Sequence, residues 1–298
     1  MFLLRRLAFL FLACAAMPAC AQQQAVPKVQ DADPALWVVK DHGTTVYLFG
    51  TIHVLKPGLT WFDEAVRKAF DASDQIVLEL VLPDAAAMQR IVVANATQPT
   101  GPTLTQRLPP ARRKQFGDAL AGLGISADAF DRVKPWFAAT NLSILPLMKL
   151  GYDPANGPET IITAQAKAQN KPVVGLETAE QQIGFFGQLS DKAQIGFLDA
   201  TLDELPKVGP TMSTMVEEWA KGQPDALARE MNDSLKASPE VARVLLVDRN
   251  KRWAGWIQNR LKTPGTVFMA VGAGHLAGPQ SVQQQLAKLG IRAVRVSY

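Results

Sequence analysis

Cysteine is almost absent from this chain of 298 residues, which contains only Cys14 and Cys20. Both cysteines lie in an N-terminal segment that has the pattern of a removable leader. Once that leader is removed, the remaining chain contains no cysteine. Disulfide bonds, thiolate metal sites and cysteine nucleophiles are therefore excluded from the mature protein, even in an oxidising compartment.

Long hydrophobic runs are also missing after the first 21 residues, and those residues have the pattern of a signal peptide. Arg5 and Arg6 precede an apolar run that is too short to span a bilayer, and Ala19-Cys20-Ala21 fits a cleavage site. A lipid anchor at Cys20 is the alternative, because the preceding Pro-Ala resembles the end of a lipobox. We therefore expect a periplasmic or secreted protein with no transmembrane segment after the leader.

An excess of one charge sign is missing as well. The formal net charge is +4, and it falls to about +2 when Arg5 and Arg6 leave with the leader. Arg112, Arg113 and Lys114 stand at helical spacing beside apolar residues, which is typical of a solvated helix face. The sequence therefore gives no indication of nucleic-acid binding.

Strand and helix patterns alternate along the chain and predict a mixed α/β fold. Two apolar runs separated by Asp41-His42-Gly43 indicate a hairpin, and residues 76–82 have the pattern of a strand covered on both faces. The C-terminal part repeats the order strand, loop, helix and strand, so we expect two βαβ-type halves that form a central mixed sheet core. The expected strands span residues 36–40, 44–49, 76–82, 172–176, 266–271 and 291–296, and the expected helices span 61–72, 159–169, 190–220 and 239–261, with a last helix that ends at 289.

The expected domain organisation is simple. Residues 22–34 are polar and predict a flexible lead-in, and residues 35–298 are expected to form one domain. Within that domain, residues from about 84 to 154 look mostly helical and are punctuated by proline and glycine. This pattern predicts a helical insertion.

The short motifs of many enzyme families are absent: HExxH, GxSxG, Walker A, CxxC, and GxGxxG after a strand. The chain has only three histidines, yet His53 and His275 each end a Gly-x-x-His motif directly after a predicted strand. Open α/β sheets place their ligand sites at such strand ends. We therefore expect these two histidines to share one site, whereas His42, in the predicted hairpin turn, is given no role.

A carboxylate interrupts an apolar strand at Glu79, where a buried charge is costly unless it is paired, hydrogen-bonded or bound to a metal. A structural ion pair is one interpretation of Glu79, and a metal ligand or general base is the other. Glu177 has the same placement at a strand end. Helix capping and function explain Glu177 equally well.

One face of the predicted helix over residues 239–261 places the amide of Asn250 among apolar residues, with Arg249 beside it. An inward Arg–Asn pair can orient Glu79, or it can hold a substrate carboxylate or a developing oxyanion. A surface arginine beside a buried, satisfied asparagine is the alternative. We take Glu79, Arg249 and Asn250 as the candidate catalytic residues.

Several segments in order resemble the TraB/GumN family, which includes the Tiki-type proteases and is distantly related to the erythromycin esterase and ChaN-like proteins. The resemblance begins near residue 35 and continues to the C-terminus. It rests on residues 48–54, 78–80, 172–178 with Glu180-Gln181 after them, 249–250 and 271–276. It implies a mixed α/β core with two GxxH motifs and a glutamate at the site, and divalent-metal-dependent peptidase activity in Tiki-like members.

Carried over by position, the resemblance implies functional roles for His53, Glu79, Arg249 and His275. We expect His53, Glu79 and His275 to hold a divalent ion, manganese, cobalt or zinc, that activates water and polarises a carbonyl. The expected function is hydrolysis of a peptide or small-molecule substrate in a cleft. Two alternatives stay open: esterase-type hydrolysis without a metal, in which a histidine and Glu79 serve as the base, and a non-catalytic binding or regulatory protein of the cell envelope.

Overall fold

The computed structural model describes residues 29–41, 43–236 and 238–298. The predicted signal peptide, the alternative lipid anchor and His42 therefore lie outside the described residues. The chain forms two compact units. The larger unit contains Val29–Val81, Leu147–Thr178 and Lys207–Tyr298, and the smaller unit contains Leu82–Pro146 and Ala179–Pro206.

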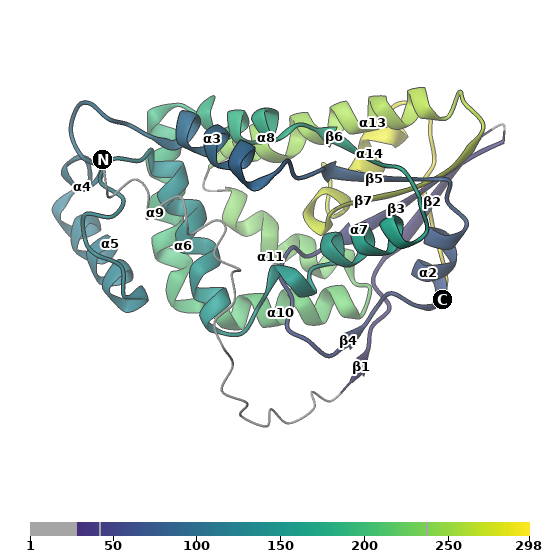
Figure 1. The fold of residues 1–298 in the computed structure, drawn as a ribbon, viewed down its shortest axis with the longest axis horizontal. Coiled ribbons are helices and arrows are strands. Elements are labelled where there is room, and N and C mark those ends of the chain that lie inside the picture. The colour runs from purple at the N-terminus through teal and green to yellow at the C-terminus, as the bar shows by residue number, and fades with distance from the viewer. Residues whose placement is uncertain (1–28, 42, 237) are drawn as a thin grey trace. The chain divides into compact units, whose positions relative to one another are not determined.

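A six-stranded sheet with the order β6-β5-β7-β3-β2-β8 forms the centre of the larger unit (Figure 1). Its strands are β2 (Leu36–Asp41), β3 (Thr44–Thr51), β5 (Gln75–Leu80), β6 (Val173–Glu177), β7 (Gly265–Gly272) and β8 (Val294–Arg295). The strands β6, β5, β7 and β3 run parallel, whereas β2 is antiparallel to both β3 and β8. The predicted mixed α/β fold with a mixed central sheet is confirmed.

The two predicted βαβ halves interleave within this sheet. In the first half, α2 (Glu64–Asp71) connects β3 to β5, but β7 lies between those two strands. In the second half, α14 (Val282–Lys288) lies between β7 and β8 in the chain, and β3 and β2 separate these strands in the sheet. The interleaving makes β3 and β7 neighbours, so the two Gly-x-x-His motifs leave the sheet side by side.

The central strands β3 and β7 are covered on both faces. Phe49 and Phe268 belong to one buried apolar cluster, and their neighbours Leu48 and Met269 belong to another. Successive side chains of a strand point to opposite faces, so the two clusters cover opposite sides of the sheet. This double cover explains why both strands appear in the sequence as nearly continuous apolar runs.

A second, two-stranded sheet includes two residues of the segment predicted as a flexible lead-in over residues 22–34. Gln30–Asp31 forms β1, which pairs in parallel with β4 (Leu59–Thr60). The adjoining Ala32 is only 2 % exposed, and its N–H donates to the carbonyl of Thr60. The polar composition of this segment did not predict these hydrogen bonds, because they join backbone groups and do not depend on side-chain type.

The remaining helical elements of the larger unit include the helices predicted over 159–169 and 239–261 and the end of the one predicted over 190–220, together with a helix over 224–236 that was not predicted. They are η2 (Pro154–Asn156), α7 (Pro158–Ala168), α10 (Val208–Ala220), α11 (Pro224–Lys236), α12 (Pro239–Ala242), a π-helical segment (Arg243–Val247), α13 (Asp248–Arg260) and η5 (Ala273–Leu276). The single helix predicted over 239–261 is therefore interrupted by a π-helical turn just before Arg249. The helix predicted over 61–72 begins later than expected, because Thr60 belongs to β4 and α2 begins at Glu64.

The smaller unit is helical and has its own core. Its helices are α3 (Ala85–Ala96), α4 (Leu104–Arg107), α5 (Pro110–Leu123), α6 (Pro135–Lys149), α8 (Ala179–Gly187) and α9 (Asp191–Glu204), with η3 (Leu205–Lys207) after α9. Residues 84–146 of the insertion predicted over about 84–154 thus form one part of this unit, and residues 179–206 supply the other part, whereas residues 147–154 belong to the larger unit. None of the helices within the described residues combines the length and apolar character needed to cross a bilayer.

Candidate functional site

The ends of β3 and β7 place the two motifs next to each other. Thr51, the last residue of β3, is paired with Gly272, the last residue of β7. His53 follows β3 by two residues, and His275 lies in the short helix η5 that follows β7. A Cβ at Gly50 would lie 3.1 Å from the Cα of Ala273, so the glycine that begins the first motif permits this close packing.

Gly272 leaves open the space on which three predicted site residues converge. A Cβ at Gly272 would lie 3.1 Å from Glu79 Oε1, 3.6 Å from His275 Cδ2 and 3.7 Å from His53 Nε2. We call this space, bordered by His53, Glu79 and His275, the central site. The structure thus brings together the three residues for which the sequence predicts one shared site.

Glu79 is held at the central site by two strong hydrogen bonds. Its Oε1 accepts from the Gly272 N–H at 2.6 Å, and its Oε2 accepts from Arg249 Nη2 at 2.6 Å. Burial alone would raise the pKa of this carboxyl, but His275, Arg249, His53 and the Gly272 N–H together lower the pKa to about 2. Glu79 is therefore a carboxylate at neutral pH, with a side chain that is 13 % exposed.

Arg249 connects the carboxylates of the site to His275. Its Nη2 donates to Glu79 and Glu177, its Nε donates to Glu177, and its Nη1 contacts the Leu245 carbonyl and His275 Nε2. These contacts employ all five N–H groups of the guanidinium. Arg249 contacts Glu79, which agrees with the first of the two functional roles considered for it, and in this arrangement it has no N–H left for a substrate carboxylate or oxyanion.

His275 is held as a neutral ring of one tautomer. Asn250 Nδ2 donates to the Gln280 carbonyl at 2.7 Å, so Asn250 Oδ1 is the acceptor for His275 Nδ1 at 2.6 Å. The Nδ1–H tautomer leaves a lone pair on Nε2, which accepts from Arg249 Nη1 at 3.1 Å. Burial, with the positive charges of Arg249 and His53, lowers the pKa of His275 to about 3 against the attraction of Glu79. Asn250 is fully buried, as the helix pattern predicts.

His53 is paired with Glu159, a residue whose importance the sequence does not reveal. Its Nδ1 lies 2.6 Å from Glu159 Oε1, and Thr51 Oγ1 donates to the same oxygen at 2.5 Å. The carboxylate of Glu159 raises the pKa of His53 to about 9, mainly by charge attraction, which exceeds the opposing effect of burial. The His53 side chain is nevertheless 70 % exposed, so its imidazole is open to solvent.

Glu159 reaches His53 because the start of α7 packs directly on the first motif. Gly157 precedes α7, and a Cβ there would lie only 2.4 Å from the His53 carbonyl oxygen. In the sequence, an acid in the first turn after Gly-Pro indicates only a favourable helix dipole. Its partner lies 106 positions away, so no local pattern could have identified the pair.

Glu177, for which capping and function stayed open, anchors Arg249. It is the last residue of β6, its side chain is 3 % exposed, and both of its oxygens accept from the guanidinium. Arg252 Nη2 lies 3.6 Å from Glu177 Oε1 as a second, partly exposed cation. Glu177 therefore balances the charge of Arg249 and fixes the orientation of its guanidinium plane.

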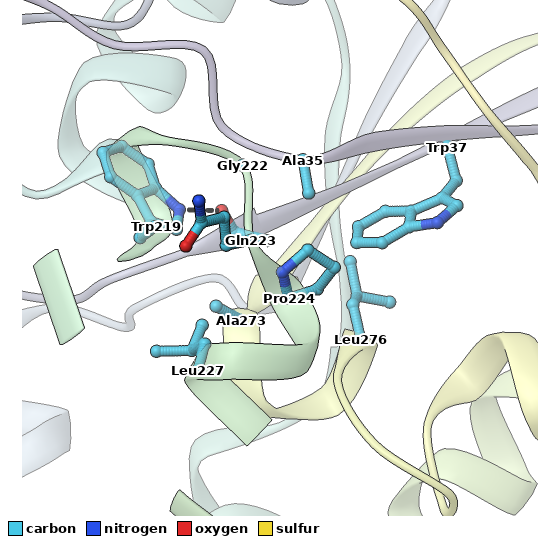
Figure 2. Close-up of a pocket in the computed structure, with 10 residues that line it drawn as sticks. Ala35, Trp37, Trp219, Gly222, Gln223, Pro224, Leu227, Ala273 and Leu276 are labelled. Atoms are coloured by element: carbon cyan, nitrogen blue, oxygen red, sulfur yellow. Dashed lines mark hydrogen bonds between the residues drawn. The ribbon is translucent and has the colours of Figure 1, made fainter. Parts of the chain in front are cut away.

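A small apolar pocket lies behind the first motif (Figure 2). Trp37, Trp219 and Leu276 are among its lining side chains, and Gly50 and Ala273 contribute to its wall. Trp219 Nε1 donates to the Gly50 carbonyl at 2.7 Å. The pocket therefore packs against the glycine that begins the first motif.

The imidazole nitrogens and the carboxylate at the central site are suitable ligands for a divalent metal ion. In the present arrangement, however, they are not all free to bind one. His275 Nε2 and Glu79 Oε1 are 3.7 Å apart, yet Arg249 Nη1 already donates to that nitrogen. A metal ion on His275 would have to displace the guanidinium and its positive charge. Within the described residues, no group of three or more His, Cys, Asp or Glu side chains is arranged as around a metal ion.

Comparison with known proteins identifies the family. The sequence profile described as TraB/PrgY/gumN family matches residues 35–295. The chain is 26 % identical over 253 residues to "Uncharacterized protein YbaP" of Escherichia coli (strain K12), covering 85 % of this chain and 92 % of that protein. It is 22 % identical over 264 residues to an "Uncharacterized protein" of Treponema pallidum (strain Nichols), covering 83 % and 78 % respectively. No solved structure matches significantly. The match over residues 35–295 includes every residue of the central site, and the chain belongs to the TraB/PrgY/gumN family.

Proposed function

We propose that this protein is a hydrolase that cleaves a peptide or ester bond at the central site. The observation that carries the proposal is the convergence of Glu79 Oε1, His53 Nε2 and the His275 ring on the open space beside Gly272. A carboxylate and an imidazole that face one space are the groups that general acid–base hydrolysis requires.

The chemistry assigns one proton transfer to each of two residues. Water attacks the substrate carbonyl carbon, and Glu79, ionised at neutral pH, accepts the proton that the water loses. His53, protonated on Nε2, donates that proton to the leaving nitrogen or oxygen as its bond to carbon breaks. Glu79 then returns its proton to His53 through solvent, which restores both groups.

The remaining residues of the site hold Glu79 in position. Arg249 and the Gly272 N–H each bind one oxygen of Glu79, which leaves the carboxylate little freedom to rotate. His275 is neutral and closes the side of the central site next to Arg249. Such fixed donors lower the cost of reorganisation during the reaction.

Metal-dependent hydrolysis is the second candidate. It is favoured by the donor set, because two histidines and one carboxylate are a common ligand set for a catalytic metal ion. His53, Glu79 and His275 would hold the ion, which would supply Lewis acidity and activate water. The present hydrogen bond from Arg249 to His275 opposes this arrangement.

One assay separates these candidates. The purified protein should hydrolyse members of a panel of peptides and esters equally well with and without a chelator, and His53→Ala should lower that turnover by a factor on the order of a hundred or more. The matched control is His42→Ala, because His42 is the one histidine to which the sequence assigns no role. Loss of turnover in chelator with recovery on addition of manganese, cobalt or zinc would favour the metal-dependent candidate, and binding of a substrate without turnover would favour a binding protein.

We also propose that the mature protein acts in the periplasm or outside the cell, after removal of the first 21 residues. The basic start, short apolar run and Ala19-Cys20-Ala21 pattern support this proposal. Intact-mass analysis of the protein from its native host should give a chain that begins at Gln22. A diacylglycerol-modified Cys20 would instead show a membrane-anchored protein.

A further inference from the structure

Glu159 is a charged residue beside the central site to which the proposed reaction gives no role. It lies in the first turn of α7, and its Oε1 is 2.6 Å from His53 Nδ1. We infer that Glu159, held by Thr51, is the positioning residue of His53 and fixes the imidazole so that Nε2 faces the central site. This inference rests on the proposed hydrolase function and goes beyond it by assigning what orients the acid.

The hydrogen bonds determine which atom donates. An ionised carboxylate has only acceptor oxygens, so the His53 contact requires a proton on Nδ1. Thr51 Oγ1 donates to the same oxygen of Glu159, which restricts rotation of the carboxylate. With Nδ1 bound in this way, the opposite ring nitrogen, Nε2, is the one that faces the space beside Gly272. The same logic applies wherever a carboxylate orients a catalytic imidazole.

The backbone is built for this contact. Gly157 allows the start of α7 to approach the His53 carbonyl, where a Cβ would lie at 2.4 Å. Pro158 occupies the first helical position and leaves Glu159 in the first turn, where the helix dipole stabilises a negative charge. The pair therefore depends on close packing between α7 and the first motif, and not on a chance meeting of two long side chains.

Stability alone does not explain the pair. The His53 side chain is 70 % exposed and that of Glu159 is 30 % exposed, and ion pairs of this kind contribute little to folding. Thr51, by contrast, is 2 % exposed, so a buried hydroxyl is committed to holding the carboxylate. A buried threonine that fixes the partner of an exposed imidazole is the arrangement expected when the reaction depends on the orientation of that ring.

The kinetic test compares two substitutions of Glu159. Glu159→Leu removes the acceptor and should lower kcat on the order of ten- to a hundredfold while KM stays nearly unchanged. Glu159→Gln keeps an acceptor oxygen of similar shape and should retain more activity than Glu159→Leu. The matched control is Glu204→Leu, an exposed glutamate at the end of α9, which should leave kcat unchanged. Unchanged kcat in Glu159→Leu, in a protein whose wild type turns over substrate, would overturn the inference and leave the proposed function intact.

A second readout does not require activity. The chain has three histidines, so ¹⁵N-histidine labelling gives a spectrum simple enough to assign with His53→Ala. The hydrogen-bonded Nδ1 proton of His53 should be visible in the wild type, retained in Glu159→Gln and lost in Glu159→Leu. If the Nδ1 proton signal of His53 is unchanged in Glu159→Leu, the inference is overturned. A signal that depends on Glu159 in a protein that hydrolyses no substrate would instead support the positioning contact and refute the proposed function.

Discussion

Thr51 and Gly272 lie opposite each other at the ends of the adjacent parallel strands β3 and β7. This pairing explains how two motifs from opposite ends of the chain form one site. The side chain of Thr51 binds Glu159 beneath His53, while Gly272 donates its N–H to Glu79 and leaves space beside its Cα. The positions of His53 and His275 therefore depend on the register of β3 and β7, and Glu79 comes from β5, the other neighbour of β7.

Filling the central site should stop the reaction without unfolding the protein. In Gly272→Ala the new methyl group would lie 3.1 Å from Glu79 Oε1, inside the central site. We expect turnover to fall at least about tenfold, because a small displacement of reacting groups has a large effect on rate. The backbone φ of −50° at Gly272 suits alanine, so the unfolding transition should shift little.

Gly255→Ala is the control for that substitution. A Cβ at Gly255 meets no atom within 4 Å, and its position in α13 predicts a gain of about 0.5 to 1 kcal/mol in helix stability. Steady-state kinetics of both variants provide the comparison. Full activity in Gly272→Ala would show that the reaction does not use this space.

Glu79→Gln should separate chemistry from stability. We expect turnover to fall by a factor on the order of ten to a hundred, because an amide cannot accept the proton of water. Arg249 would keep Glu177 and the Leu245 carbonyl as partners, so the free energy of unfolding should fall by only about 1 to 3 kcal/mol. Kinetics and thermal unfolding on one preparation test both effects. A destabilised variant with normal turnover would remove Glu79 from the reaction.

The sequence predicted much of this site, because strand patterns and motif positions are local. The apolar runs around His53 and His275 identified the strands, and the buried charge of Glu79 indicated the need for a partner. The inward face of α13 identified Arg249 and Asn250. These inferences needed only the periods of strands and helices.

The parts that the sequence did not predict depend on contacts between distant segments. The order of the strands, with β7 between β3 and β5, follows from tertiary packing, and the residue pattern of a single strand does not predict it. Glu159 meets His53 only because α7 packs on the first motif. The short pairing of β1 with β4 is made by backbone groups, which a polar composition does not reveal.

Asn250→Leu should be strongly destabilising although the volume of the side chain changes little. The substitution leaves the buried Nδ1–H of His275 without its acceptor and removes the hydrogen bond to the Gln280 carbonyl. We expect the free energy of unfolding to fall by about 2 kcal/mol or more. Asn259→Leu, an exposed position on the same helix, should stay within about 0.5 kcal/mol of wild type. Denaturant titration compares them, and equal stabilities would contradict the proposed tautomer of His275.

The His53–Glu159 pair predicts a particular dependence of stability on pH. Because Glu159 raises the pKa of His53 from 6.5 to about 9, the folded protein binds this proton more tightly than the unfolded chain does. This exposed pair contributes only a small stabilisation, which is fully present below pH 6.5 and is lost as the pH rises through about 9. The melting temperatures of wild type and Glu159→Gln should therefore converge on going from about pH 6 to above pH 9. A constant difference across this range would show that the pair does not share a proton in this way.

The central claim is that His53 and Glu79 act in one chemical step, and a double-variant cycle tests it most directly. Turnover of a peptide or ester substrate is measured for wild type, His53→Ala, Glu79→Gln and the double variant. Residues that act as a unit show strongly non-additive effects, so the double variant should be about as slow as the slower single variant. Losses that multiply, or single variants as active as wild type, would contradict the account.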